Sequence, residues 1–222
     1  MKGLFVTATD TDVGKTWIGA QLVAQLIEQG ISVKARKPIE SGWPSDQFVN
    51  ETDAWKLADA MGEIADLALV CPNRFKATIS PERAAMLEGE TINLEKLQKD
   101  CLKEISDSDF LYVEGAGGFY SPICDGALNA DLATSLRLPV VLVVENRLGC
   151  INQALLNVEA IKNRGLKLAA IVLNSPSHAE LNEDMDNFSD IQKRVECQVI
   201  KFDFNQSSKD SIKELSQAVL VE

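Results

Sequence analysis

The sequence predicts an α/β fold, a doubly wound and mostly parallel sheet with helices on both faces. Short runs rich in β-branched and aromatic residues alternate with longer segments of helical periodicity. Several short runs are apolar almost throughout, which is typical of parallel strands covered on both faces. Strand–helix–strand alternation with right-handed crossovers then places successive strands in one sheet.

The expected elements follow one another in order along the chain. Strands are expected at 4–7, 33–37, 110–114, 140–145 and 169–173, and helices at about 15–29, 51–61, 93–106, 128–136 and 151–164. In the first helix, Ile18, Leu22 and Leu26 recur every four residues, and the following Gly30 is a helix stop signal. A last helix over 208–222 has a similar apolar face, so it should pack on the sheet.

The segment 38–50 follows the second expected strand and is expected to be a loop, because it is rich in Pro, Gly and Ser. Loops that follow strands in open α/β sheets line the ligand crevice. The sequence has no repeat, no low-complexity run and no linker that would separate a second domain. We therefore expect residues 1–222 to form one domain.

The composition narrows the classes of partner. Of the 222 residues, 45% are hydrophobic and 25% are charged, as in ordinary globular proteins. The net charge of −11 argues against nucleic acid and anionic membranes, because those partners require clustered Lys and Arg. We expect neither as a partner. A pocket of backbone N–H groups and lysines can still bind one anionic ligand.

The cysteines and the start of the chain indicate the compartment. The five cysteines form no C-x-x-C pair, which favours buried thiols in a reducing compartment over disulfides or metal ligands. The N-terminus lacks a signal-peptide pattern, and no apolar run reaches the about 18 residues of a membrane span. The expected location is the cytoplasm. His178, the only histidine, is expected in a surface loop, so proton transfer must rely on other groups or on the substrate.

The strongest functional signal is the run TDTDVGKT at 9–16, between the first strand and the first helix. A Gly-Lys-Thr in this context is typical of a P-loop, which binds a nucleoside triphosphate. Lys15 would reach the β- and γ-phosphates, and the Thr16 hydroxyl would bind Mg²⁺. The N–H groups that would face the phosphates belong to Asp12, Val13, Gly14, Lys15, Thr16 and Trp17.

The start of this P-loop departs from the common pattern. The first glycine of the motif would fall at Thr9, or at Ala8 if the loop has one more residue. Alanine is tolerated there if its φ is negative and is strained if φ is positive.

Other oxygen ligands for Mg²⁺ are expected at the ends of elements. Glu114 ends a strand expected to lie beside the P-loop strand, and the glycine-rich run Gly115-Ala116-Gly117 follows it. A carboxylate at that position suits the metal, and the glycines allow the loop to wrap around the γ-phosphate. Asp53 begins a helix, where an acid is most often a cap, so its position alone favours a structural role.

Lys37 ends the second expected strand and would face the same crevice as Lys15. Lysines are usually exposed to solvent, so a surface role remains open. Two lysines that converge on one crevice would stabilise the negative charge of phosphoryl transfer. Ser41 follows in the run KPIESG and could bind a substrate through its hydroxyl or N–H.

Four blocks together resemble dethiobiotin synthetases: TDTDVGKT at 9–16, KPIESG at 37–42, VEGAGG at 113–118 and RLGCIN at 147–152. The match runs in order over about residues 1–175. The resemblance implies a homodimer of the P-loop NTPase fold that uses ATP and Mg²⁺. In that family the enzyme closes the ureido ring of 7,8-diaminopelargonate with CO₂ to give dethiobiotin in biotin biosynthesis.

The resemblance also implies roles for individual residues. The metal positions match Thr16, Asp53 and Glu114, and the ATP site matches residues 12–17, the run 114–117 and, at the adenine edge, Asn174. The catalytic lysine matches Lys37, with Lys15 beside it, and the carbamate and substrate contacts match Thr11 and Ser41. The stretch that reaches the substrate's carboxylate end across the dimer matches Leu148, Gly149 and Asn152.

Two further departures concern recognition of the base and of the substrate tail. The family commonly has Gly-x-x-Pro after its last strand, where this chain has the run VIKFDF at 199–204. In the family an aromatic residue is expected near position 181 to hold the substrate tail, but this chain has Leu181 there. Base preference and the residue that holds the tail are therefore not predicted.

Two alternatives share this fold class. One is a partner-switching ATPase of the chromosome- or division-positioning type, which dimerises on DNA or membrane; its loop usually carries an additional lysine, and positions 8–13 contain none. The other is an amidotransferase-linked synthetase, which usually has a second, glutaminase domain that 222 residues cannot accommodate. The ligand that stimulates ATP hydrolysis distinguishes these classes.

Overall fold

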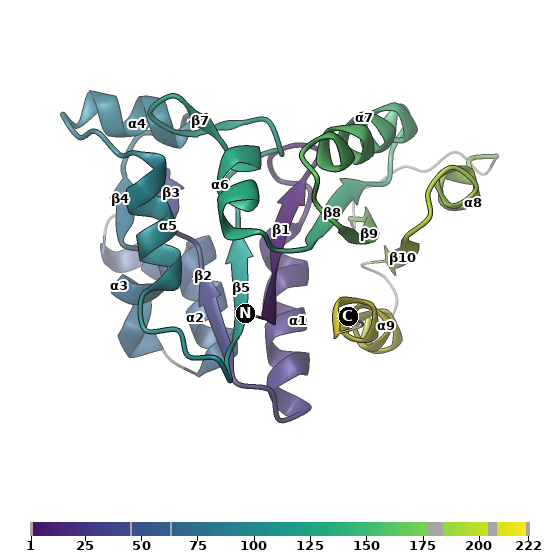
Figure 1. The fold of residues 1–222 in the computed structure, drawn as a ribbon, viewed down its shortest axis with the longest axis horizontal. Helices are drawn as coiled ribbons and strands as arrows, with labels where there is room; N and C mark the ends of the chain where they lie inside the picture. The colour runs from purple at the N-terminus through teal and green to yellow at the C-terminus, as the bar shows by residue number, and fades with distance from the viewer. Residues whose placement is uncertain (1, 45, 63, 177–183, 204–207, 221–222) are drawn as a thin grey trace.

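A computed structural model describes residues 2–44, 46–62, 64–176, 184–203 and 208–220 (Figure 1). His178, Leu181 and Phe204, about which the sequence raised expectations, lie outside the described residues.

The centre of the fold is a six-stranded sheet in the order β10-β9-β8-β1-β5-β2, in which every pairing is parallel. Its strands are β1 (Lys2–Ala8), β2 (Val33–Arg36), β5 (Phe110–Glu114), β8 (Val140–Glu145), β9 (Leu168–Ser175) and β10 (Gln198–Asp203). The predicted doubly wound, parallel sheet is therefore confirmed. The direction of winding changes at β1, and such a switch point opens a crevice at the carboxyl ends of the strands.

Helices cover both faces of the sheet (Figure 1). Successive side chains of a strand point to opposite faces, so Leu4 and Val6 join one core and Phe5 joins the other. The first core also contains residues of α1 (Lys15–Glu28), α2 (Asp53–Met61) and α9 (Lys209–Leu220). The second contains residues of α4 (Pro81–Leu87), α5 (Leu94–Leu102), α6 (Asn129–Leu136), α7 (Cys150–Asn163) and α8 (Asn187–Gln192). The C-terminal helix thus packs on the sheet, as predicted.

The prediction that 38–50 is entirely loop is wrong. It contains β3 (Ile39–Ser41), which pairs in parallel with β4 (Asn73–Phe75), and the start of a 3₁₀ helix, Asp46–Glu51. The pairing is possible because Ile39 and Phe75 are both buried in the core, a tertiary contact that the Pro- and Ser-rich composition does not reveal. The remaining short elements are α3 (Leu67–Val70) and an antiparallel pair, β6 (Pro122–Cys124) and β7 (Ala127–Leu128).

The cysteines are free thiols. Four of them are buried and Cys197 is half-buried, as the sequence predicted for thiols outside disulfides. Within the described part of the chain, no helix has the length and apolar character needed to cross a membrane.

Candidate functional site

The predicted P-loop connects β1 to α1. Ala8 is the last residue of β1 and is not among the described residues with positive φ, so the missing glycine causes no backbone strain. Two other positions take left-handed conformations, Asp12 at φ 58° and Gly14 at φ 97°. A Cβ on Gly14 would also lie 2.4 Å from the Asn174 amide nitrogen. Gly14 is therefore required by both conformation and space.

The N-terminus of α1 is free to bind an anion. No side chain caps this helix, and its first turn contains no acidic residue. The first N–H groups of a helix have no partner within it, and the helix dipole places partial positive charge there. The Lys15 ammonium lies 3.4 Å from the Asp10 carbonyl oxygen, which keeps it beside the loop. This arrangement matches a phosphate site.

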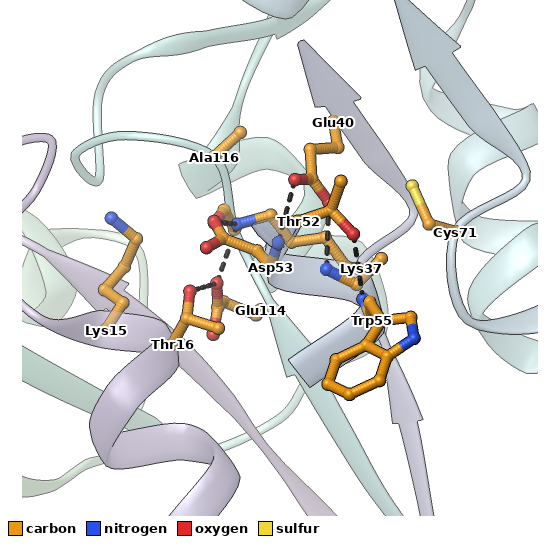
Figure 2. A network of polar contacts seen from close by, with 12 residues as sticks. Lys15, Thr16, Lys37, Glu40, Thr52, Asp53, Trp55, Cys71, Glu114 and Ala116 are labelled. Carbon is orange, nitrogen blue, oxygen red and sulfur yellow. Dashed lines mark hydrogen bonds and ion pairs between the residues drawn. The ribbon is translucent and has the colours of Figure 1, made fainter. Parts of the chain in front are cut away.

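A buried ion cluster lies next to the P-loop (Figure 2). The Lys37 ammonium is 2.8 Å from Asp53 Oδ2 and 2.7 Å from Glu114 Oε1. The Thr16 hydroxyl donates to the same Glu114 oxygen at 2.7 Å, and the Tyr112 hydroxyl donates to its other oxygen at 3.1 Å. Because β1, β2 and β5 are neighbours, their carboxyl ends bring these side chains together from distant parts of the sequence.

The cluster fixes the charges of its members. Burial lowers the pKa of Lys37, but the charges of Asp53 and Glu114 outweigh burial and raise that pKa well above its ordinary value. Burial opposes ionisation of Asp53, yet the charge and hydrogen bond of Lys37 lower the pKa of Asp53 to about 2. Burial and the nearby Lys37 lower the pKa of Lys15. A bound polyphosphate would favour the charged form of both lysines.

A cavity of about 790 Å³ opens over the P-loop and the ion cluster. It is large enough for a drug-sized ligand. The predicted site residues that line it are Thr11, Asp12, Gly14, Lys15, Thr16, Trp17, Lys37, Ser41, Asp53, Ala116 and Gly117. Three more predicted residues do not line the cavity but adjoin residues that do. Glu114 accepts a hydrogen bond from Thr16, the Gly115 carbonyl lies 3.4 Å from the Lys37 ammonium, and Val13 lies between Asp12 and Gly14 in the chain. Asn174 is close by and donates to the Val13 carbonyl at 2.9 Å.

The three residues predicted to reach across a dimer are not part of this cavity wall. Leu148 is 82% exposed, and Asn152 is also exposed. Gly149 takes φ 89° and precedes the first residue of α7. Their predicted contact with substrate requires a second copy of the chain and stays a prediction.

Comparison with known proteins gives the family. A family model described as an AAA domain matches residues 2–201. The ATP-dependent dethiobiotin synthetase BioD of Caulobacter vibrioides is 40% identical over 176 residues, which cover 78% of this chain and 80% of that protein. The same-named protein of Cellvibrio japonicus is 38% identical over 199 residues, 87% of this chain and 85% of that one. The chain belongs to the ATP-dependent dethiobiotin synthetase family. It is therefore a ligase of biotin biosynthesis.

Solved structures that resemble this synthetase support its fold. A ParA family ATPase from Chlorobium tepidum superposes with a TM-score of 0.54 at 16% identity, covering 99% of this chain and 92% of that one. The MinC:MinD cell division complex of Aquifex aeolicus gives 0.54 at 15% identity, with the same coverage. At this identity the likeness shows the shared P-loop fold alone. The closer sequence relatives decide between synthetase and partner-switching ATPase.

Sequence reasoning missed two buried polar side chains that shape the site of the synthetase. Asn129, at the start of α6, accepts a hydrogen bond from the Ala116 N–H at 2.9 Å. Its amide nitrogen lies 2.7–3.1 Å from the carbonyl oxygens of Ala116, Gly118 and Ser121, so it fixes the loop after β5. Glu40 similarly binds the start of α2. Glu40 lies within the block KPIESG, but the block does not reveal its contact with α2, and no motif marks Asn129, because each acts on a segment distant in sequence.

The donor set of the cluster fits Mg²⁺. Thr16, Asp53 and Glu114 offer a hydroxyl and two carboxylates, and the Lys37 ammonium already lies against both carboxylates, so the position accepts a cation. Among the residues described here, no group of three or more His, Cys, Asp or Glu side chains could hold a metal ion by itself. Mg²⁺ typically takes one or two carboxylates and completes its shell with phosphates and water.

Proposed function

We propose that this synthetase closes the ureido ring of 7,8-diaminopelargonate with CO₂ at the cost of one ATP, giving dethiobiotin, ADP and phosphate. One observation carries the proposal. The Lys37 ammonium lies 2.7 and 2.8 Å from two carboxylates at the wall of the cavity that also contains the P-loop. A site of this kind positions anions and stabilises the charge of phosphoryl transfer.

The substrate supplies the nucleophiles in this scheme. One amine adds to CO₂, loses a proton and becomes a carbamate. A carbamate oxygen attacks the γ-phosphorus, the bond to the β–γ bridging oxygen breaks, and ADP leaves. The second amine attacks the carbon of the mixed anhydride, the bond from carbon to the phosphate oxygen breaks, and phosphate leaves as the ring closes. The attacking amine releases a proton, which the departing phosphate can accept.

The residues of the cavity take the following parts. The N–H groups of residues 12–17 and the Lys15 ammonium hold the triphosphate. Lys37 stabilises charge on the transferred phosphoryl group, and Thr11 orients the carbamate. Ser41 lines the same cavity and contacts the substrate. Asn174, next to Gly14, contacts the adenine edge, and the run 115–117 closes the γ-phosphate end.

Thr16, Asp53 and Glu114 would hold Mg²⁺. The ion, when bound, neutralises the β- and γ-phosphate oxygens. The buried Glu114 side chain keeps its place through the hydroxyl groups of Thr16 and Tyr112. The Asp53 carboxylate is held separately, by the Lys37 ammonium at 2.8 Å.

We further propose that the synthetase is a homodimer, in which Leu148, Gly149 and Asn152 of one copy complete the substrate site of the other. Leu148 and Asn152 are both exposed, so a second copy of the chain can reach them. The free thiols and the acidic charge support the cytoplasm as its location.

The proposal is tested by measuring which ligands stimulate ATP hydrolysis. Hydrolysis should require both 7,8-diaminopelargonate and bicarbonate, and neither alone should suffice. The Lys37→Ala variant should bind ATP but form no dethiobiotin. Stimulation by DNA or by lipid vesicles would contradict the proposal and favour a partner-switching ATPase. Normal turnover by Lys37→Ala would remove Lys37 from the mechanism.

A further inference from the structure

Glu40 binds the first turn of α2 from a neighbouring element. It is the middle residue of β3, and its side chain is 9% exposed. Its two carboxylate oxygens accept hydrogen bonds from the N–H groups of Asp53 and Ala54, at 2.9 and 3.0 Å (Figure 2). A carboxylate at the N-terminus of a helix is stabilised by these N–H groups and by the helix dipole. The contact therefore joins β3 firmly to α2.

The same turn has a second side-chain cap, which provides a comparison. The Thr52 hydroxyl accepts a hydrogen bond from the Trp55 N–H at 3.1 Å. The Thr52 side chain thus stabilises the helix, but its hydrogen bond is with the Trp55 N–H and not with the Asp53 N–H. Glu40 binds that backbone directly, and the Asp53 carboxylate lies 2.8 Å from the Lys37 ammonium.

The chain connection strengthens this link. Only Pro38 and Ile39 separate Lys37 from Glu40, and the proline ring restricts the backbone between them. One short segment therefore holds both the ammonium that contacts the Asp53 side chain and the carboxylate that binds the Asp53 backbone. A displacement of α2 relative to β3 would break both contacts.

We infer that Glu40 is a positioning residue that fixes Asp53 for metal binding and for its ion pair with Lys37. This inference rests on the proposed role of Asp53 as a metal ligand. The bonds require a carboxylate of this length. Glutamine has a single acceptor oxygen, and its NH₂ group would face one of the two N–H donors. Aspartate keeps the charge, but its side chain is one methylene shorter and cannot reach the N–H groups of Asp53 and Ala54.

The test compares Glu40→Gln and Glu40→Asp with Thr52→Val in the full chain. Mn²⁺ replaces Mg²⁺, and electron paramagnetic resonance measures its binding in the presence of a non-hydrolysable ATP analogue. Loss of a residue that orients a ligand typically weakens metal affinity about 10- to 100-fold. We expect a loss of at least about tenfold for both Glu40 variants. Thr52→Val should lower the unfolding temperature but change the Mn²⁺ affinity much less.

A double-mutant cycle with Asp53→Asn separates positioning from general stability. If Glu40 acts through Asp53, adding Glu40→Gln to Asp53→Asn should cause little further loss of Mn²⁺ affinity. Additive losses, equal losses for Thr52→Val and Glu40→Gln, or unchanged affinity in Glu40→Asp would overturn the inference. If one Glu40 variant does not fold, the other and the cycle built on it give the answer. A wild-type chain that binds no Mn²⁺ with the nucleotide would instead refute the proposed metal site.

Discussion

Replacing Lys37 by Met removes the counter-charge of two carboxylates while keeping most of the side-chain volume. Asp53 and Glu114 would then face each other without the ammonium that lies within 2.8 Å of both. Glu114 is fully buried, so water cannot replace the lost partner. Removing one member of a buried ion pair typically costs about 3–5 kcal/mol, because the other charge remains buried and uncompensated. We expect a loss of free energy of unfolding in this range near neutral pH.

The Asp53 contact accounts for a minor part of that loss. Lowering the pKa of Asp53 from 3.8 to about 2 corresponds to about 2.4 kcal/mol at 1.36 kcal/mol per pKa unit. Its side chain is 38% exposed, and solvent screening reduces this to about 1 kcal/mol. The rest of the expected loss comes from the unpaired Glu114 carboxylate. The double variant Lys37→Met/Glu114→Gln removes that charge and should recover most of the stability.

The pH dependence also differs between the two proteins. In the wild type, Asp53 has a folded-state pKa below its unfolded-state value, so its contribution is present above about pH 4 and is lost as pH falls toward 2. Lys37→Met lacks the ammonium that lowers the pKa of Asp53, so this acid-induced loss of stability should shrink. Urea unfolding near pH 7.5 and across the range from about pH 4 to about pH 2 measures both effects. A variant as stable as the wild type near pH 7.5, or one that loses as much stability as the wild type on acidification, would refute the reasoning.

Three other substitutions test separate contacts. A Cβ in Gly19→Ala would lie 1.9 Å from the Tyr112 hydroxyl oxygen, so thermal unfolding should show a loss of about 1–3 kcal/mol, together with reduced activity. Asn129→Asp replaces the amide that faces three carbonyl oxygens, and urea unfolding should show a loss of about 1–3 kcal/mol with slower turnover; wild-type values would exclude its role in the loop. The wild type should lose stability between about pH 4 and pH 2 as Asp53 becomes protonated, and Asp53→Asn should remove this part of the loss. If the unfolding free energy of the variant falls with pH as much as that of the wild type, Asp53 is not paired with Lys37 as described.

The sequence predicted the elements whose own pattern is strong. The strand 110–114 and the strand 140–145 have the predicted limits, because continuous apolar runs bounded by polar residues define buried parallel strands. The helix Lys15–Glu28 ends within a residue of its prediction, because its apolar period and Gly30 are local signals.

Short and edge elements could not be predicted in this way. β3 and β4 have three residues each and are stable only because they pair and bury Ile39 and Phe75. β10 lies at the edge of the sheet, where the polar Lys201 interrupts its apolar pattern. Such elements depend on partners that are distant in the sequence, and a local pattern does not identify those partners.

The site residues likewise fall into those that a local pattern predicts and those that depend on contacts distant in the sequence. The P-loop is a local motif, and Lys37 and Glu114 could be placed because the carboxyl ends of parallel strands meet at one edge of the sheet. The sequence alone does not distinguish Asp53 from an ordinary helix cap, and only the resemblance to dethiobiotin synthetases indicated its role in metal binding. The contacts of Glu40 with α2 and of Asn129 with the loop after β5 join residues 8 to 14 positions apart, and no spacing rule indicates them.

The central claim is that a carbamate oxygen attacks the γ-phosphate in the cavity beside Lys37. It is tested most directly with bicarbonate labelled with ¹⁸O, by mass spectrometry of the phosphate released during dethiobiotin formation. The account predicts one oxygen from bicarbonate in each phosphate, because the bond that breaks at ring closure joins carbon to oxygen. Phosphate that contains only oxygen from ATP and water would contradict it.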